Sequence, residues 1–153
     1  NGMRKKLGLS FFMIKGAWGM MLLSIICGFA LALDLLGDQG PALFGFVLLF
    51  GWLLTYIKGM LQRIVPFLAA MNMSKRNHKP PRLSELAQGS PLKLHAICHG
   101  LAIVVGATSI ALDQPDGLRV AGLVGFIGAA GFAWFCFSVL RSFFTYHRTA
   151  AEN

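Results

Sequence analysis

Two histidines four residues apart, His95 and His99, begin a long apolar run in the stretch "LKLHAICHGLAIVV", residues 92–105. On a helix, side chains at this spacing share one face, with Cβ atoms about 6 Å apart, so both imidazoles can bind one transition-metal ion. Cys98 lies close to the same face and could add a thiolate ligand. The pattern therefore predicts a candidate metal site at His95, Cys98 and His99.

Three other interpretations use the same region. A haem b could not take both axial ligands from this pair, which approaches from one side, so it would need His99 together with His147, with Arg63 orienting a propionate. A quinone or an anionic lipid headgroup would need only a cationic pocket and hydrogen-bond donors. In the last interpretation there is no ligand, and histidines at the end of a transmembrane helix anchor the chain at the level of the lipid headgroups.

The composition indicates the environment of these residues. The chain of 153 residues is 56% hydrophobic and only 13% charged, with a mean hydropathy of +0.63, whereas soluble domains carry about 25% charged residues. Its 18 glycines and 13 phenylalanines are typical of membrane helices. The composition predicts an all-α integral membrane protein.

Four apolar runs are long enough to cross a bilayer, which takes about 20 residues each. The predicted spans cover about residues 8–35, 41–72, 95–112 and 118–146, and a basic loop, 74–93, joins the second to the third. Short connections make neighbouring helices antiparallel. We therefore expect a single membrane domain, residues 1–153, folded as a four-helix antiparallel bundle.

The basic residues predict the orientation. With the N-terminus inside, only Arg119 of the 14 lysines and arginines falls on the outer side. Cytoplasmic loops of membrane proteins carry an excess of Lys and Arg, so we expect both termini to be cytoplasmic, in a bacterial inner membrane. The same rule explains the net charge of +8 without nucleic acid as a partner. Four of the six acidic residues fall in the outer turns: Asp34, Asp38, Asp113 and Asp116.

This topology predicts a polar cluster at the cytoplasmic edge of the bundle. The first residues of the third span and the last of the fourth are expected to lie at one depth, and the basic end of the second span joins them. Polar groups in spans usually face the bundle interior or a wet cavity. The predicted members are Lys58, Gln62, Arg63, His78, His95, His99 and His147.

Small residues four apart follow one face of the fourth span. In lipid, such a stripe lets another helix approach closely, within the chain or in a second copy, and a flat cofactor would fit there as well. We therefore expect membrane lipids and a homo-oligomer or a larger membrane complex as partners. The stripe consists of Ala121, Gly125, Ala129 and Ala133, and it is broadened by Gly122, Gly128 and Gly131.

The stretch "LFGFVLLFGWLLTYIKGMLQRIVPFLAAMN", Leu43 to Asn72, resembles a segment of bacterial haem–copper oxidase subunit I-like membrane proteins, including relatives of the nitric-oxide response proteins. A glycine-spaced apolar run there ends in a basic residue followed by Ile-Val-Pro-Phe, as at Arg63 to Phe67. The basic loop "KPPRLSEL" followed by "LKLHAICH" is also similar. The resemblance covers about half of the chain and implies its terminal four-helix part, with a haem or metal at His95 and His99.

Three function classes follow from these patterns. The first is a redox-associated membrane subunit or accessory protein with a haem or transition metal at the cytoplasmic edge. The second is a small carrier or channel for an ion or solute, and the third is a structural membrane partner without a ligand. The chain has no HExxH, CxxC or Gly-rich phosphate motif, and no acidic residue lies in the interior of a span. We therefore assign no catalytic residue and expect no enzyme activity from this chain by itself.

Overall fold

The computed structural model describes residues 2–74 and 89–151, with side chains described for 8–74 and 90–148, and it confirms the predicted all-α bundle. Within these ranges every regular element is a helix. They are α1 (Gly2–Ala32), the 3₁₀ turn η1 (Gly37–Gln39), α2 (Gly40–Phe46), the π-helical segment η2 (Val47–Leu53), α3 (Leu54–Ser74), α5 (Gly89–Ala111) and α6 (Pro115–Ala151).

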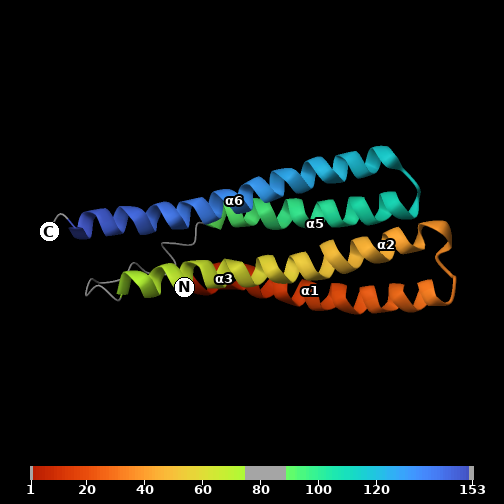
Figure 1. The fold of residues 1–153 in the computed structure, drawn as a ribbon, viewed down its shortest axis with the longest axis horizontal. Helices are drawn as coiled ribbons and strands as arrows, with labels where there is room; N and C mark the ends of the chain where they lie inside the picture. The colour runs from red at the N-terminus through yellow and green to blue at the C-terminus, as the bar shows by residue number, and fades with distance from the viewer. Residues whose placement is uncertain (1, 75–88, 152–153) are drawn as a thin grey trace.

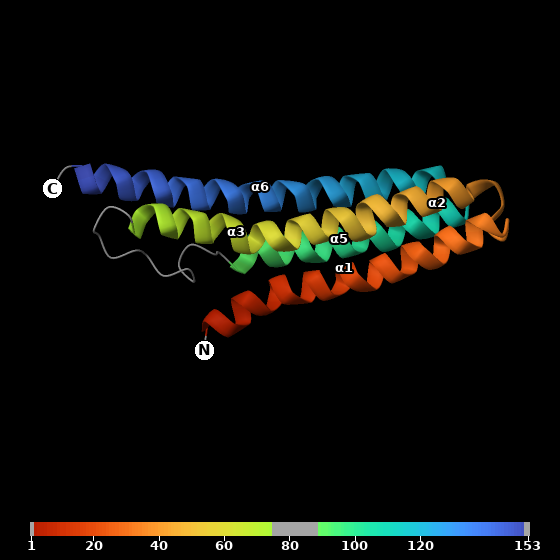
Figure 2. The ribbon, with the colours of Figure 1, turned by 60° about the horizontal axis from the view of Figure 1, so that its bottom comes forward.

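The helices form two antiparallel hairpins that lie side by side (Figures 1 and 2). One hairpin pairs α1 with the continuous rod α2–η2–α3, and the other pairs α5 with α6, which form the most extensive interhelical contact. The two hairpin turns lie together at one end of the bundle. Toward its N-terminus α1 diverges from the other helices (Figure 2).

The distribution of side chains is that of a multi-pass membrane protein. Four helical stretches, Gly8–Ala32, Gly37–Ser74, Ser90–Ala111 and Pro115–Arg148, are long and apolar enough to span a bilayer. Large apolar side chains such as Phe126, 74% exposed, cover the outside, where a water-soluble protein would not tolerate them. The buried set is instead rich in polar residues, namely Ser10, Ser24, Thr55, Gln62, His95, His99 and Ser109.

Both hairpin turns begin with the same helix cap. Asp34 and Asp113 adopt left-handed backbone conformations, with φ of 57° and 51°. At each site two N–H groups return to the last turn of the helix, for example Leu35 N–H to Ala30 O at 2.9 Å, as in a Schellman motif. Gln39 Nε2 donates to Asp113 Oδ1 across 3.1 Å and ties the two turns together.

The third span begins earlier than hydropathy predicts. The loop is expected to run through residue 93 and the span to start at residue 95, but α5 starts at Gly89. Pro91 lies in its first turn, where the missing N–H and the fixed φ of proline suit a helix. The rest of the predicted loop, with His78, lies outside the described residues.

The second span is continuous through Pro66, which lies buried inside α3, so this proline does not end the helix. Pro41, where the predicted second span begins, lies in the first turn of α2. In η2 the backbone widens to i→i+5 hydrogen bonds, as in Leu54 N–H to Leu49 O. Single π turns of this kind often occur at functional sites, and this one leads directly into Thr55.

A candidate ligand site inside the helix bundle

His95 and His99 lie inside the bundle and not at the exposed end of a helix. Because α5 begins at Gly89, His99 is ten residues into the helix, about 15 Å from its start at 1.5 Å per residue. His95 is 0% exposed and His99 is 8% exposed. The interpretation of this pair as headgroup-level anchors is therefore wrong, since neither side chain reaches the outside of the bundle.

His95 is held by the backbone of α6. Its Nδ1 lies 3.0 Å from Gly128 O, and because a carbonyl oxygen only accepts, Nδ1–H is the donor. In the neutral imidazole Nε2 is then an acceptor, and this atom is buried without a hydrogen-bond partner. The ring also packs on Phe132, with centroids 5.0 Å apart, and on His99 at 5.6 Å.

A glycine on α6 makes this contact possible. A Cβ added at Gly128 would lie 2.9 Å from Cys98 Cβ and 3.5 Å from His95 O. Gly131 similarly faces Pro91 O at 3.4 Å. The α6 backbone therefore approaches α5 along Gly128 and Gly131 of the predicted stripe, whereas its Ala129 and Ala133 are exposed.

His99 connects the two hairpins. Its Nε2 lies 2.6 Å from Thr55 Oγ1 on α3, and the Thr55 hydroxyl lies 3.2 Å from Phe50 O, five residues earlier in the π turn. A hydroxyl has one proton to donate. When Thr55 donates it to Phe50 O, His99 must donate Nε2–H to Thr55 Oγ1, which leaves Nδ1 of the neutral ring as the acceptor.

Replacing Thr55 with valine tests this link. Valine has nearly the same size but no hydroxyl, so His99 Nε2 loses its partner, and we expect the free energy of unfolding to fall by about 1 kcal/mol. Unfolding in mixed detergent micelles measures this change. In the control Thr108→Val the lost hydroxyl contacts only carbonyls of its own helix, so little change is expected. An equal loss in both variants would contradict an inter-hairpin role for Thr55.

A cavity of about 410 Å³ lies beside His99, between the second span and α6. Its walls are almost entirely apolar, and Lys58 and His99 are the basic side chains on its lining. Lys58 is also close enough to interact electrostatically with both His95 and His99. The principal wall residues are Phe46, Phe50 and Leu54 from the second span and Ala121, Gly122, Gly125, Phe126 and Ala129 from α6.

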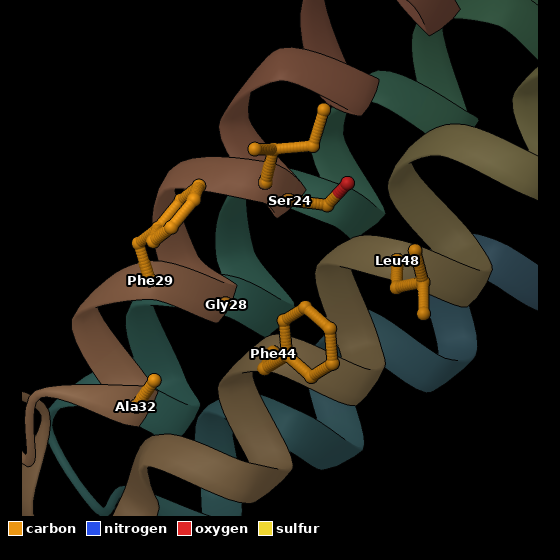
Figure 3. Close-up of a pocket in the computed structure, with 7 residues that line it drawn as sticks. Ser24, Gly28, Phe29, Ala32, Phe44 and Leu48 are labelled. Carbon is orange, nitrogen blue, oxygen red and sulfur yellow. The ribbon is translucent and has the colours of Figure 1, made fainter.

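A second hollow of about 320 Å³ lies between α1 and α2 and differs in chemistry (Figure 3). Gly28, Phe29, Phe44 and Leu48 give it an apolar lining. Its only side-chain hydroxyl, that of Ser24, donates to Met21 O at 2.7 Å. This shallow groove suits an acyl chain of the surrounding lipid and offers nothing to a polar ligand.

Two of the predicted site residues lie elsewhere. On α6, Phe132 is the residue that contacts His95. His147 lies 15 residues after Phe132, about 22 Å farther along the helix axis. The prediction that His95 and His147 lie at the same depth is therefore wrong. His147 packs on Phe143 at 4.2 Å. Arg63 Cζ lies 4.1 Å over the ring of Phe11 and so points to α1.

The arrangement therefore does not fit the predicted metal or haem centres. The Cys98 Cβ faces Gly128 on the neighbouring helix, and in residues 2–74 and 89–151 no three His, Cys, Asp or Glu side chains come together to hold a metal ion. A haem would need His99 Nε2, which Thr55 occupies, and its proposed second ligand, His147, is too far away.

Comparison with protein-family models, with curated proteins and with solved structures finds no match to this chain. The function must therefore be inferred from the chain's own residues. The arrangement of His99 and Lys58 at one end of an apolar cavity can bind a polar head by hydrogen bonds and charge while the walls bind a hydrocarbon part.

Thr55 is the residue of this site that the sequence patterns above do not single out. It lies three residues before Lys58 and seven before Gln62, so the three polar side chains follow one another on neighbouring faces of α3 within an otherwise apolar run. A polar residue at helical spacing from a membrane-embedded lysine is the signal that could have identified it.

Proposed function

We propose that this multi-pass membrane protein binds a lipid-soluble molecule with a polar head inside the cavity beside His99. The observation that supports this proposal is the pairing of Lys58 and His99 with apolar walls from two hairpins. Ligand sites usually combine a mostly apolar, concave lining with a few polar groups that orient the ligand. Charged residues within spans generally mark ligand or ion pathways.

The cavity is accessible from the side of the bundle. Gly122, Phe126 and Ala129 contribute to its lining and are also exposed on the lipid-facing surface of α6. A ligand dissolved in the bilayer can therefore enter laterally, with its head directed to Lys58 and its hydrocarbon part between Phe50 and α6.

The proposal accommodates two of the predicted function classes. A quinone bound here through its carbonyl oxygens would make the chain a redox-associated subunit or accessory protein. Another amphiphile, bound and released to the bilayer, would make it a carrier. Both roles need the same cavity, so the binding of an amphiphile is the activity to test first.

We further propose that both termini lie in the cytoplasm, with the chain in a bacterial inner membrane. The support is the distribution of charge, since Asp34, Asp38, Asp113 and Asp116 are in or beside the two turns. α6 is 37 residues long, about 55 Å, and so extends well beyond a hydrocarbon core of about 30 Å at the opposite, basic end.

A bulky residue at the mouth of the cavity tests the binding proposal. No atom lies within 4 Å of a Cβ added at Gly122, so Gly122→Trp can fold while its indole fills the entrance. We expect the amount of amphiphile retained by the purified protein, measured by native mass spectrometry, to fall at least tenfold.

The matched control is Gly100→Trp. This glycine is also exposed and within a span, and a Cβ added to it would meet no atom within 4 Å, but it is not part of the cavity. Retention in this variant should equal that of the wild type. If both variants retain the same amphiphiles as the wild type, the cavity is not the binding site and the proposal fails.

A further inference from the structure

On the basis of the proposed function, we infer that the head of the ligand is an anion, a carboxylate or a phosphate, bound by Lys58. It rests on three features of the site: a lysine within a span, the lack of a counter-ion in the described part of the chain, and apolar walls that strengthen the attraction between opposite charges.

Lys58 lies within the membrane-spanning part of the second span and is half-buried. An ammonium group at such a position is costly unless it is paired. Lys58 forms no ion pair with another side chain of residues 8–74 and 90–148; the salt bridge between Arg119 and Asp116 lies elsewhere. The described part of the chain therefore supplies a cation without a neutralising partner.

Among the described residues, the acidic side chains are too far from Lys58 to act as partners. From Lys58 to the start of α2 at Gly40 is 18 residues, about 27 Å of helix, and Asp38 lies beyond that point. Asp113 also lies at that end, where its carboxylate accepts from Gln39. An anion beside Lys58 must therefore come from outside the described chain.

The other side chains near Lys58 increase the preference for an anion. His95 and His99 are neutral or cationic in water and so cannot neutralise Lys58, and both lie within electrostatic range of the ammonium. Apolar walls from Phe46, Phe50 and Leu54 keep the dielectric constant low, so the attraction between an ammonium and an anionic head is much stronger than in water.

A neutral head would leave this charge uncompensated. A hydroxyl or a quinone carbonyl can accept a hydrogen bond from Lys58, but it adds no opposing charge. A carboxylate or phosphate supplies both a hydrogen-bond acceptor and the opposing negative charge. The site should therefore prefer an acid to the alcohol of the same chain length.

The test compares three probes on the purified full chain in neutral detergent: oleic acid, oleyl alcohol and an alkyl phosphate of equal chain length. We expect the wild type to bind at least one acid tenfold more tightly than the alcohol. Lys58→Gln should lose this preference and Lys58→Arg should retain it, and the stronger of the two acids identifies the natural head. In the matched control Lys15→Gln, an exposed lysine of α1 outside the cavity, the preference should remain.

The outcomes separate this inference from the proposed function. Equal affinity of the wild type for acid and alcohol, with both lost in Gly122→Trp, would overturn the anionic head and leave the binding cavity in place. Binding of every probe that is unchanged in Gly122→Trp would instead refute the cavity itself. The comparison of probes uses the wild-type protein, so it decides the question even if Lys58→Gln does not fold.

Discussion

Replacing Gly128 with leucine should lower the free energy of unfolding by about 3 kcal/mol, within the range for overpacked or disrupted buried contacts. The reason is steric, because a Cβ at this position already lies 2.9 Å from Cys98 Cβ and 3.5 Å from the His95 carbonyl. α6 would have to move away from α5, and the Gly128 O to His95 Nδ1 hydrogen bond of 3.0 Å would be lost. Unfolding in mixed micelles measures the effect.

Gly122→Leu is the matched control, since a Cβ at Gly122 meets nothing within 4 Å. Both variants add the same side chain to the same helix. A change below about 0.5 kcal/mol is expected for the control, as for surface substitutions in general. Equal destabilisation in the two variants would mean that close packing at Gly128 does not hold α5 against α6.

Truncation of His95 to alanine should cost about 2–4 kcal/mol. His95 is among the largest fully buried side chains, so the change leaves a cavity beside Phe132. It also removes the hydrogen-bond donor of Gly128 O. The same unfolding assay measures the loss, and His95→Gln, which keeps a donor, should recover part of it.

Ile97→Ala provides the comparison on the same helix. Ile97 is 62% exposed on the lipid-facing side of α5, so its truncation should have a small effect. His147→Ala should also cost less than His95→Ala, because His147 lies about 22 Å away along α6 and contacts its own helix at Phe143. A negligible effect of His95→Ala would show that this histidine is not buried.

The number of spans and their antiparallel order are predictable because a bilayer imposes a minimum length of apolar sequence. The start of α5 is harder to predict, because hydropathy rises only at His95. The residues Pro91 to Leu94 belong to the helix since proline suits its first turn. This difference of six residues moves both histidines from the edge of the bundle to its interior.

The composition of the site is only partly predictable. His99 and Lys58 are both members of the predicted polar cluster, because polar residues in spans tend to face the interior. His99 pairs with Thr55 of α3, and His95 pairs with Gly128 of α6. Such contacts between helices cannot be predicted from residue spacing within one segment. The predicted depth of His147 is wrong because it requires the fourth span to end level with His95 of the third, whereas α6 continues well past that level to Ala151.

The most direct test of the binding cavity is photo-crosslinking with a diazirine-bearing fatty acid, followed by mass-spectrometric mapping of the labelled peptides. We predict labelling concentrated on residues 46–54 of the second span and 118–129 of α6, which line the cavity, and competition by unlabelled fatty acid. Uniform labelling over lipid-facing side chains such as Phe12, Leu22 and Phe144, without competition, would contradict the account.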